Sequence, residues 1–233
     1  MTRKQLTWHR LDNGQLERAI ILDFESFQVG PTVLAGVLAD GQFEQVVFDR
    51  RLDLAARAKG LDVADLAGWS SLLVRRAIDQ DRLIVAFSST ESDVLVDMGV
   101  EVPGLRFVNA KMVADEWRKR CRPAIRKQVA QMRRKLRVSR SPKQRERYWA
   151  KEGNRLIDYA ANVGIKRPHM YRHRGVTRRL NDVMGQLQRR GAYGRLTRTA
   201  KAKWANVLRH NEFDVVGLSE MLGIMIREMW SHA

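Results

Sequence analysis

The sequence predicts an α/β fold in which helices flank a mixed sheet and a large basic helical region precedes the last helix. Five short apolar runs lie within the first 110 residues, where a tight turn and two helical segments separate them. Strands joined by a turn pair antiparallel, whereas strands separated by a helix usually pair parallel, so both kinds of neighbour are expected. From residue 110 onward no run is typical of a strand, and apolar residues recur at helical spacing.

Three consecutive strands are expected first, over residues 19–24, 31–40 and 43–49. Asp40-Gly41 separates the last two, and Asp-Gly between β-rich runs is a strong hairpin signal. The elements that follow are a helix over 64–79, a buried strand over 82–87, a helix to about residue 98 capped by Ser88 or Ser89, and a strand over 105–109.

The remaining chain predicts helices only. Their expected ranges are 110–121, 124–137, 153–163, 174–190, 198–209 and 212–230. Gly164 and Gly191 follow two of these ranges, as glycine commonly does at helix ends. The apolar residues of the last helix form one face that can dock on the sheet.

Composition excludes several classes of protein. The chain of 233 residues is 44% hydrophobic with 5 Pro and 16 Gly, which rules out collagen-like and wholly disordered chains. Its single cysteine, Cys121, excludes an internal disulfide and a cysteine-based zinc site. No stretch is typical of a signal peptide or approaches the ~20 apolar residues of a membrane span, so we expect a soluble, cytoplasmic protein without membrane contact.

Charge is unevenly distributed along the chain, whose formal net charge is +17. Residues 1–105 carry 11 basic and 16 acidic side chains, residues 106–210 carry 31 and 6, and residues 211–233 carry 1 and 4. A basic middle segment of this density predicts contact with the phosphates of DNA or RNA. The acidic ends indicate a separate site where carboxylates gather.

Asp23 and Glu25 stand at the end of the first predicted strand. Because side chains alternate along a strand, both carboxylates point to one side and Phe24 to the other. Paired hard oxygen ligands favour Mg²⁺ or Mn²⁺, although a pair of solvent-exposed acids is the alternative. Further acids follow in VAFSSTESDVL, where Glu91 or Asp93 lies near a helix start, and in HNEFDVVGL, where Asp214 is expected on the first turn of the last helix.

These three segments resemble the exonuclease motifs of the DEDD superfamily, which includes the DnaQ-like exonucleases. The nearest resemblance is to the YprB-type exonucleases, whose second motif is similar to Ser88-Ser89-Thr90-Glu91 and whose last motif is similar to residues 201–214. The segment 154–168 resembles the family moderately, and residues 111–150 match nothing in it. His210 stands four residues before Asp214, where one subgroup carries Tyr, although a surface histidine is the alternative.

The resemblance implies a ribonuclease H-like core over residues 1–110 and 205–233, with 111–204 as a basic helical insertion. It implies a metal-dependent 3′–5′ exonuclease that hydrolyses DNA or RNA with two Mg²⁺ or Mn²⁺ ions. Asp23, Glu25, Glu91 and Asp214 would be the metal ligands and catalytic residues, with Asp23 bridging both ions. His210 would position or deprotonate the attacking water, and Asn211 would contact a ligand or cap the last helix.

Several residues of the basic region are candidates for contact with nucleic acid. The expected phosphate contacts are Lys201, Lys203, Arg133, Arg134, Lys135 and Arg137. Aromatic residues available for base stacking, or for core packing instead, are Trp117, Tyr148, Trp149, Tyr171 and Trp204. His169 and His173 are a weaker candidate metal pair, because they lack the glutamate of HExxH. The competing functions are a non-catalytic nucleic-acid-binding protein and an endonuclease or resolvase on the same scaffold.

Overall fold

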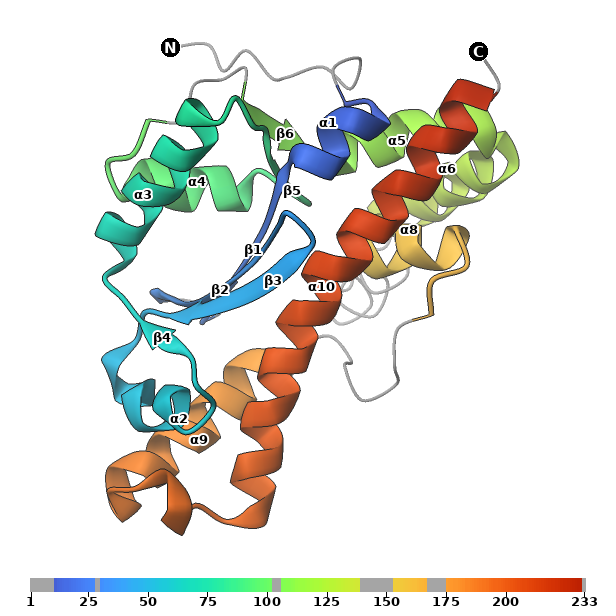
Figure 1. Ribbon diagram of the computed structural model, residues 1–233. Helices are drawn as coiled ribbons and strands as arrows, with labels where there is room; N and C mark the ends of the chain where they lie inside the picture. Colours follow the sequence, from blue (N-terminus) through green and yellow to red (C-terminus); the bar gives the residue numbers. More distant parts are fainter. Residues whose placement is uncertain (1–10, 28–29, 102–105, 139–152, 167–174, 232–233) are drawn as a thin grey trace.

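The computed structural model describes residues 11–27, 30–101, 106–138, 153–166 and 175–231 and contains one six-stranded mixed sheet (Figure 1). Its strands are β1 (Ile20–Ser26), β2 (Thr32–Ala39), β3 (Gln42–Val47), β4 (Asp62–Val63), β5 (Ile84–Ala86) and β6 (Phe107–Asn109). They lie in the order β4-β3-β2-β1-β5-β6. Strands β1, β2 and β3 pair antiparallel, while β5 pairs parallel with both β1 and β6, and β4 with β3. The predicted α/β class with a mixed sheet is confirmed.

Helices cover both faces of the sheet. They are α1 (Asn13–Arg18), α2 (Asp53–Arg57), α3 (Leu66–Asp79), α4 (Thr90–Asp97), α5 (Ala110–Cys121), α6 (Pro123–Val138), α8 (Leu156–Asn162), α9 (Val176–Arg190) and α10 (Arg198–Ser231), with short 3₁₀ turns η2 (Arg50–Leu52) and η4 (Tyr193–Arg195). Helices α3 and α4 lie on one face, and the long α10 runs diagonally across the other (Figure 1).

Strand β1 alternates between two apolar cores, as its pattern predicts. Ile21 packs with α10, α5 and α8, whereas Ile20 and Leu22 pack with α3 and α4. Phe24 continues the second set, since its ring meets Trp69 of α3 edge-on with ring centres 6.1 Å apart. Burial of these side chains therefore turns the odd-numbered positions of β1 toward α10.

The predicted β2–β3 hairpin is confirmed. Asp40 and Gly41 have φ angles of 54° and 73°, the positive values that a type I′ turn requires at both central positions. Ala39 pairs with Gln42 across the turn, which sets the register of the two strands. That register aligns Gly36 of β2 with Gln45 of β3.

The prediction of two helices at the C-terminus is wrong, because α10 is one helix of 34 residues. Asp214 and Asn211 lie in its interior, so Asp214 is not in a first turn and Asn211 does not cap the helix. The segment around His210 contains neither Gly nor Pro, and its polar residues interrupt the apolar pattern without breaking the helix. Of these polar residues, His210 and Asn211 are buried against the sheet, whereas Arg209 and Glu212 are exposed.

Several short elements are absent from the sequence-based prediction. Helix α1, the turn η2, helix α2 and the two-residue strand β4 all lie in stretches without a strong periodic pattern. Because β4 occupies residues 62 and 63, helix α3 begins at Leu66 rather than at residue 64. Strand β1 also continues to Ser26, two residues beyond its predicted end, so Asp23 and Glu25 lie within the strand.

Helix α10 joins two of the three apolar cores. Its C-terminal half packs with α1, α5, α8 and the sheet, and includes Leu218 and Met225. Its N-terminal half packs with α9, η2, α2 and strand β2, and includes Trp204. Helices α5 and α8 belong to the predicted insertion 111–204, yet Trp117 and Tyr159 are fully buried in the same core as the sheet.

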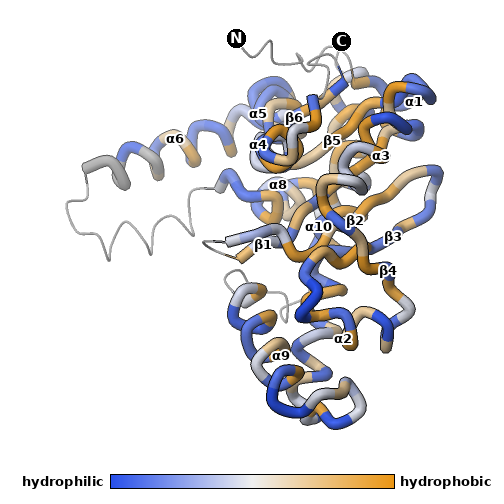
Figure 2. Tube along the Cα trace, turned by 90° about the vertical axis from the view of Figure 1, so that its left-hand side faces the viewer, coloured by the Kyte–Doolittle hydropathy of each residue, from blue (hydrophilic) through white to orange (hydrophobic). Residues whose placement is uncertain are grey.

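Helix α6 projects away from the body of the protein and is largely hydrophilic (Figure 2). Val129 is one of its partly buried residues, and it lies against Gly153. Among the residues that the structure describes, no helix combines the length and the apolar character needed to cross a bilayer.

Replacing Trp204 with Ala is expected to destabilise the protein by about 3–5 kcal/mol, because the ring is fully buried and its Nε1 donates a hydrogen bond to the Ala55 carbonyl at 3.1 Å. Trp230→Ala is the matched control, since that ring on the same helix is 62% exposed. Urea denaturation measures both, and equal losses would contradict the assignment of Trp204 to the core.

Candidate metal centre

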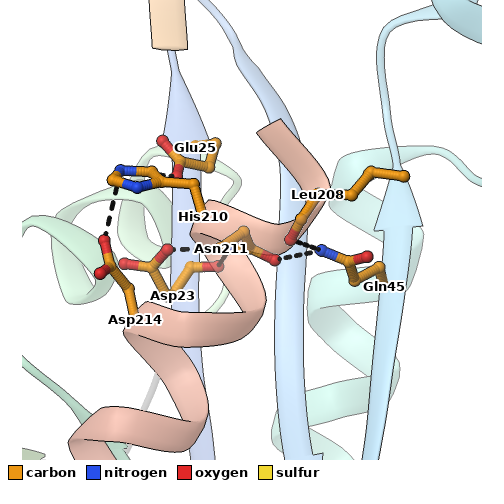
Figure 3. Close-up of polar contacts among 7 residues, drawn as sticks. All are labelled: Asp23, Glu25, Gln45, Leu208, His210, Asn211 and Asp214. Atoms are coloured by element: carbon orange, nitrogen blue, oxygen red, sulfur yellow. Dashed lines mark hydrogen bonds and ion pairs between the residues drawn. The ribbon is translucent and has the colours of Figure 1, made fainter. Parts of the chain in front are cut away.

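Strand β1 and helix α10 bring four potential ligands together (Figure 3). Asp23 and Glu25 project from the face of β1 that α10 covers. His210 and Asp214 are four residues apart on α10, so they lie one helical turn apart on the same side of the helix. Residues nearly 190 positions apart in the sequence thus share one small volume.

His210 lies between two carboxylates. Its Nε2 atom is 3.7 Å from Glu25 Oε1 and 3.4 Å from Asp214 Oδ2. The residue is 5% exposed, so it is not the surface histidine considered as the alternative. One ligand atom each from Glu25, His210 and Asp214 falls within 4.8 Å of the others, a spacing that fits a single cation.

Asn211 connects the helix to the sheet beside this cluster. Its Nδ2 donates to Asp23 Oδ2 at 2.8 Å and to the Asp23 carbonyl at 3.3 Å. Its Oδ1 accepts a hydrogen bond from Gln45 Nε2 at 2.9 Å, and the same nitrogen donates to the Leu208 carbonyl of α10 at 2.9 Å. Fully buried Asn211 therefore has both ends of its amide paired with the sheet.

Gly36 provides the space that Asn211 occupies. It pairs with Asp23 on one side and with Gln45 on the other, so the three residues form a row across β1, β2 and β3. A Cβ atom at Gly36 would lie 2.2 Å from Asn211 Oδ1, closer than such atoms approach. Any other residue at this position would push Asn211 or α10 away.

Glu91 is the buried acid of the α4 segment. It is 7% exposed and accepts a hydrogen bond from Ser88 Oγ at 2.9 Å, whereas Asp93 is partly exposed. Ser88 Oγ also accepts a hydrogen bond from the backbone N–H of Thr90. Ser88 therefore both stabilises the start of α4 and orients the Glu91 carboxylate. Glu91 is also among the charges that raise the pKa of Asp23. Among the described residues, the ligand atoms that lie within 4.8 Å of one another belong to Glu25, His210 and Asp214, and Glu91 is outside that group.

The carboxylates repel one another. Burial raises the pKa of Asp23 well above its ordinary value, and the charges of Glu25, Asp214 and Glu91 raise it further, while the hydrogen bond from Asn211 lowers it. Burial is also the main cause that raises the pKa of Glu91. Acids whose charges raise one another's pKa cost free energy while they are charged, and a divalent cation offsets that cost.

The chemistry of the donors fits Mg²⁺ or Mn²⁺. Carboxylate oxygens are the ligands that these hard cations prefer, and imidazole is more compatible with Mn²⁺ than with Mg²⁺. Asp23, Glu25, Glu91 and Asp214 would hold the cations, with His210 adjacent.

The expected phosphate contacts lie in different surroundings. Lys203 forms an ion pair with Asp182 of α9, and Lys201 Nζ donates to the Gly194 carbonyl at 2.8 Å, so both lysines brace the α9–α10 connection. Arg134 is exposed on α6. Arg133, Lys135 and Arg137 also belong to α6, and their side chains lie outside the described part.

The aromatic candidates divide into two groups. Trp117 and Trp204 are fully buried, so they are core residues and not base-stacking platforms. Tyr148, Trp149 and Tyr171 lie outside the described residues, as do His169 and His173.

Sequence reasoning missed Gln45 and Gly36 and considered only other roles for Asn211. A glycine inside an otherwise β-branched and apolar strand is the one signal that pointed here, because it often marks a close backbone approach. The contacts of Gln45 depend on strand register and on the path of α10, and neither is visible in a local pattern.

Asp23→Asn is expected to raise the melting temperature of the metal-free protein in EDTA at pH 8. Since the folded-state pKa of Asp23 is raised, the folded state holds more protons than the unfolded state between the ordinary value of 3.8 and the folded value. Stability therefore falls as pH rises through this window and stays lower above it. The gain from Asp23→Asn should shrink as pH is lowered toward 3.8, which thermal melts at several pH values measure. Asp79→Asn, at an exposed position of α3, is the control for the substitution itself, and a gain as large as that of Asp23→Asn would contradict this account.

Comparisons of the chain with protein-family models, with curated proteins and with solved structures found no match.

Proposed function

We propose that this protein is a metal-dependent 3′–5′ exonuclease that hydrolyses phosphodiester bonds of DNA or RNA. The observation that carries the proposal is the meeting of Glu25 of β1 with His210 and Asp214 of α10, beside Asp23, which Asn211 of the same helix contacts. The charges of Glu25, Asp214 and Glu91 all raise the pKa of Asp23, which supports including Glu91 in the proposed site. The central position of β1 in a mixed sheet is compatible with a ribonuclease H-like fold, and the resemblance of the acidic motifs to the DEDD superfamily supports the same function.

The proposed chemistry divides between the cations and the side chains. Two divalent cations, when bound, supply activation of the attacking water and stabilisation of the leaving 3′ oxygen. Asp23, whose pKa the charges of Glu25, Asp214 and Glu91 raise, would be one of the ligands that hold the cations. His210 positions the water or accepts its proton, a role that imidazole side chains commonly fill.

Basic helices stand on either side of the acidic end of β1. Figure 2 shows α6 projecting on one side of this strand end and α9 lying on the other. Arg126, Lys127 and Arg134 are exposed on α6, and Arg189 and Arg190 are exposed at the end of α9. Positive charge on both flanks would attract a phosphate backbone toward the carboxylates, which alone would repel it.

Degradation of 5′-labelled single-stranded DNA and RNA with Mn²⁺ or Mg²⁺ tests the proposal. Wild type should shorten the strand from its 3′ end, and EDTA, Asp23→Ala and Asp214→Ala should each abolish the ladder. Glu91→Gln should lower the rate at least ~100-fold, the equivalent of about 2.7 kcal/mol. Asp93→Asn is its matched control and should retain activity, because Asp93 is partly exposed on the same helix turn.

Other outcomes would point to the competing functions. Cleavage that proceeds on a strand with a blocked 3′ end would indicate an endonuclease. Binding of strands that stay intact with both metals and several substrate forms would contradict the catalytic proposal and favour a nucleic-acid-binding protein.

Neutralising α6 is expected to weaken binding without changing cleavage of bound strands. Arg126→Ala with Arg134→Ala should make the dependence of log K on log[salt] shallower by about 0.7 for each lost phosphate contact to a single strand. Arg75→Ala, at an exposed position of α3 on the other face of the sheet, should leave that slope unchanged. Fluorescence anisotropy at several salt concentrations measures the slopes, and equal slopes for all variants would exclude α6 from the interface.

A further inference from the structure

Asn211 lies where helix α10 closely approaches the sheet at Gly36. It is fully buried in the interior of the helix, where it cannot serve as a cap. Burying an amide is unfavourable unless its donors and acceptor are paired, and here both ends are paired with groups of β1 and β3 (Figure 3). An apolar residue could be buried at this position without the free-energy cost of desolvating an amide. The presence of Asn211 therefore suggests a role for its hydrogen bonds.

The Nδ2 group of Asn211 orients Asp23. Its Nδ2 holds Oδ2 of the Asp23 carboxylate at 2.8 Å and also reaches the carbonyl of the same residue at 3.3 Å. A donor that contacts both the side chain and the backbone of one residue restricts rotation of the carboxylate. The second carboxylate oxygen, Oδ1, is thereby kept in a defined direction relative to Glu25 and Asp214.

The Oδ1 atom of Asn211 helps to fix the position of α10. Gln45 Nε2 donates hydrogen bonds to Asn211 Oδ1 and to the Leu208 carbonyl, each at 2.9 Å. Strand β3 is therefore bonded to both a side chain and the backbone of α10. On the same helix, His210 directly precedes Asn211 and Asp214 follows it by three residues. A shift or rotation of α10 that moved them away from Glu25 would break these two bonds.

We propose that Asn211 is a positioning residue that holds the Asp23 carboxylate and fixes α10 on the sheet so that the four acids form one metal site. Gln45 supports it from β3, and Gly36 provides the space for its amide. The proposal rests on the proposed function in one respect, namely that the acids bind a divalent cation. Both ends of the Asn211 amide are paired within the protein, so its inferred role is to position other residues.

Mn²⁺ binding to the full-length protein, measured from the electron paramagnetic resonance signal of free Mn²⁺, tests this role without any substrate. Asn211→Ala should weaken Mn²⁺ binding by about 10–100-fold, the usual effect of removing a group that orients a metal ligand. Gln45→Met should also weaken it, because the side chain keeps its length but loses both donated hydrogen bonds. Val207→Ala is the matched control: it removes buried volume from the same helix, and should lower the melting temperature but not the Mn²⁺ affinity.

A double-mutant comparison tests the close approach at Gly36. Gly36→Ala alone should weaken Mn²⁺ binding, because its Cβ would lie 2.2 Å from Asn211 Oδ1. In the Asn211→Ala background the added methyl group meets no amide, so Gly36→Ala should cause no further loss. This non-additivity is a readout that general destabilisation does not produce.

Two results would overturn the inference. Asn211→Ala and Gln45→Met proteins that bind Mn²⁺ as tightly as wild type would show that these contacts do not position the acids. Fully additive losses at Gly36 and Asn211 would show that the two residues act separately. Failure of the wild-type protein itself to bind Mn²⁺ is a different result, since it would overturn the proposed function and remove the site that Asn211 is inferred to support.

Discussion

The approach of helix α10 to the sheet at Gly36 is the constraint on which the rest of the structure depends. Without a side chain at Gly36, the amide of Asn211 lies against β2 and reaches Asp23 and Gln45 on either side. This contact sets where a 34-residue helix crosses the sheet. The acids of β1 and of α10 meet because the helix crosses β1 beside Asp23. A crossing one residue earlier or later along β1 would separate them.

Apolar packing holds the two halves of α10 while the polar contact sets its register. The N-terminal half is buried with α9 and α2, and the C-terminal half with α5, α8 and the sheet. Between them lies the stretch from His210 to Asp214, which contributes carboxylate, amide and imidazole groups. Repulsion among the acids raises the pKa of Asp23, and the packing on both sides is what keeps such a costly arrangement folded.

Much of the sheet could be predicted from the sequence, because local signals control it. The alternation around Phe24 and the Asp40-Gly41 turn determine which residues face each core, and both predictions are confirmed. The continuity of α10 could not be predicted in this way. A helix on a sheet normally shows an unbroken apolar stripe. In α10 the stripe is interrupted from His210 to Asp214, because side chains there contact the acidic site instead of an apolar core. The interruption therefore reflects tertiary contacts and not the end of a helix. The same applies to Gln45, whose partner on α10 is 166 residues away.

The basic residues of the segment 106–210 serve two different purposes. Some form contacts that stabilise the fold, and others are exposed on the surface. Arg118 is 3% exposed and stacks on the Tyr159 ring at 3.8 Å, and Arg122 pairs with Glu228 at 2.8 Å, so both charges stabilise the contacts of α5 with its neighbours. Lys203 is likewise paired, with Asp182. Charges used in this way contribute less to the attraction of a polyanion than their number indicates, because each lies beside a carboxylate or within the core. Among the described residues, exposed cations of this region lie on several elements: on α6 (Arg126, Lys127, Arg134), on α9 (Arg178, Arg189, Arg190), at Arg195, and on α10 (Arg198, Arg209). Figure 2 shows α6 and α9 on either side of the acidic end of β1. In the proposed function, α6 and α9 would hold a strand of nucleic acid on either side of the carboxylates, and this would give the uneven charge of the chain a physical reason.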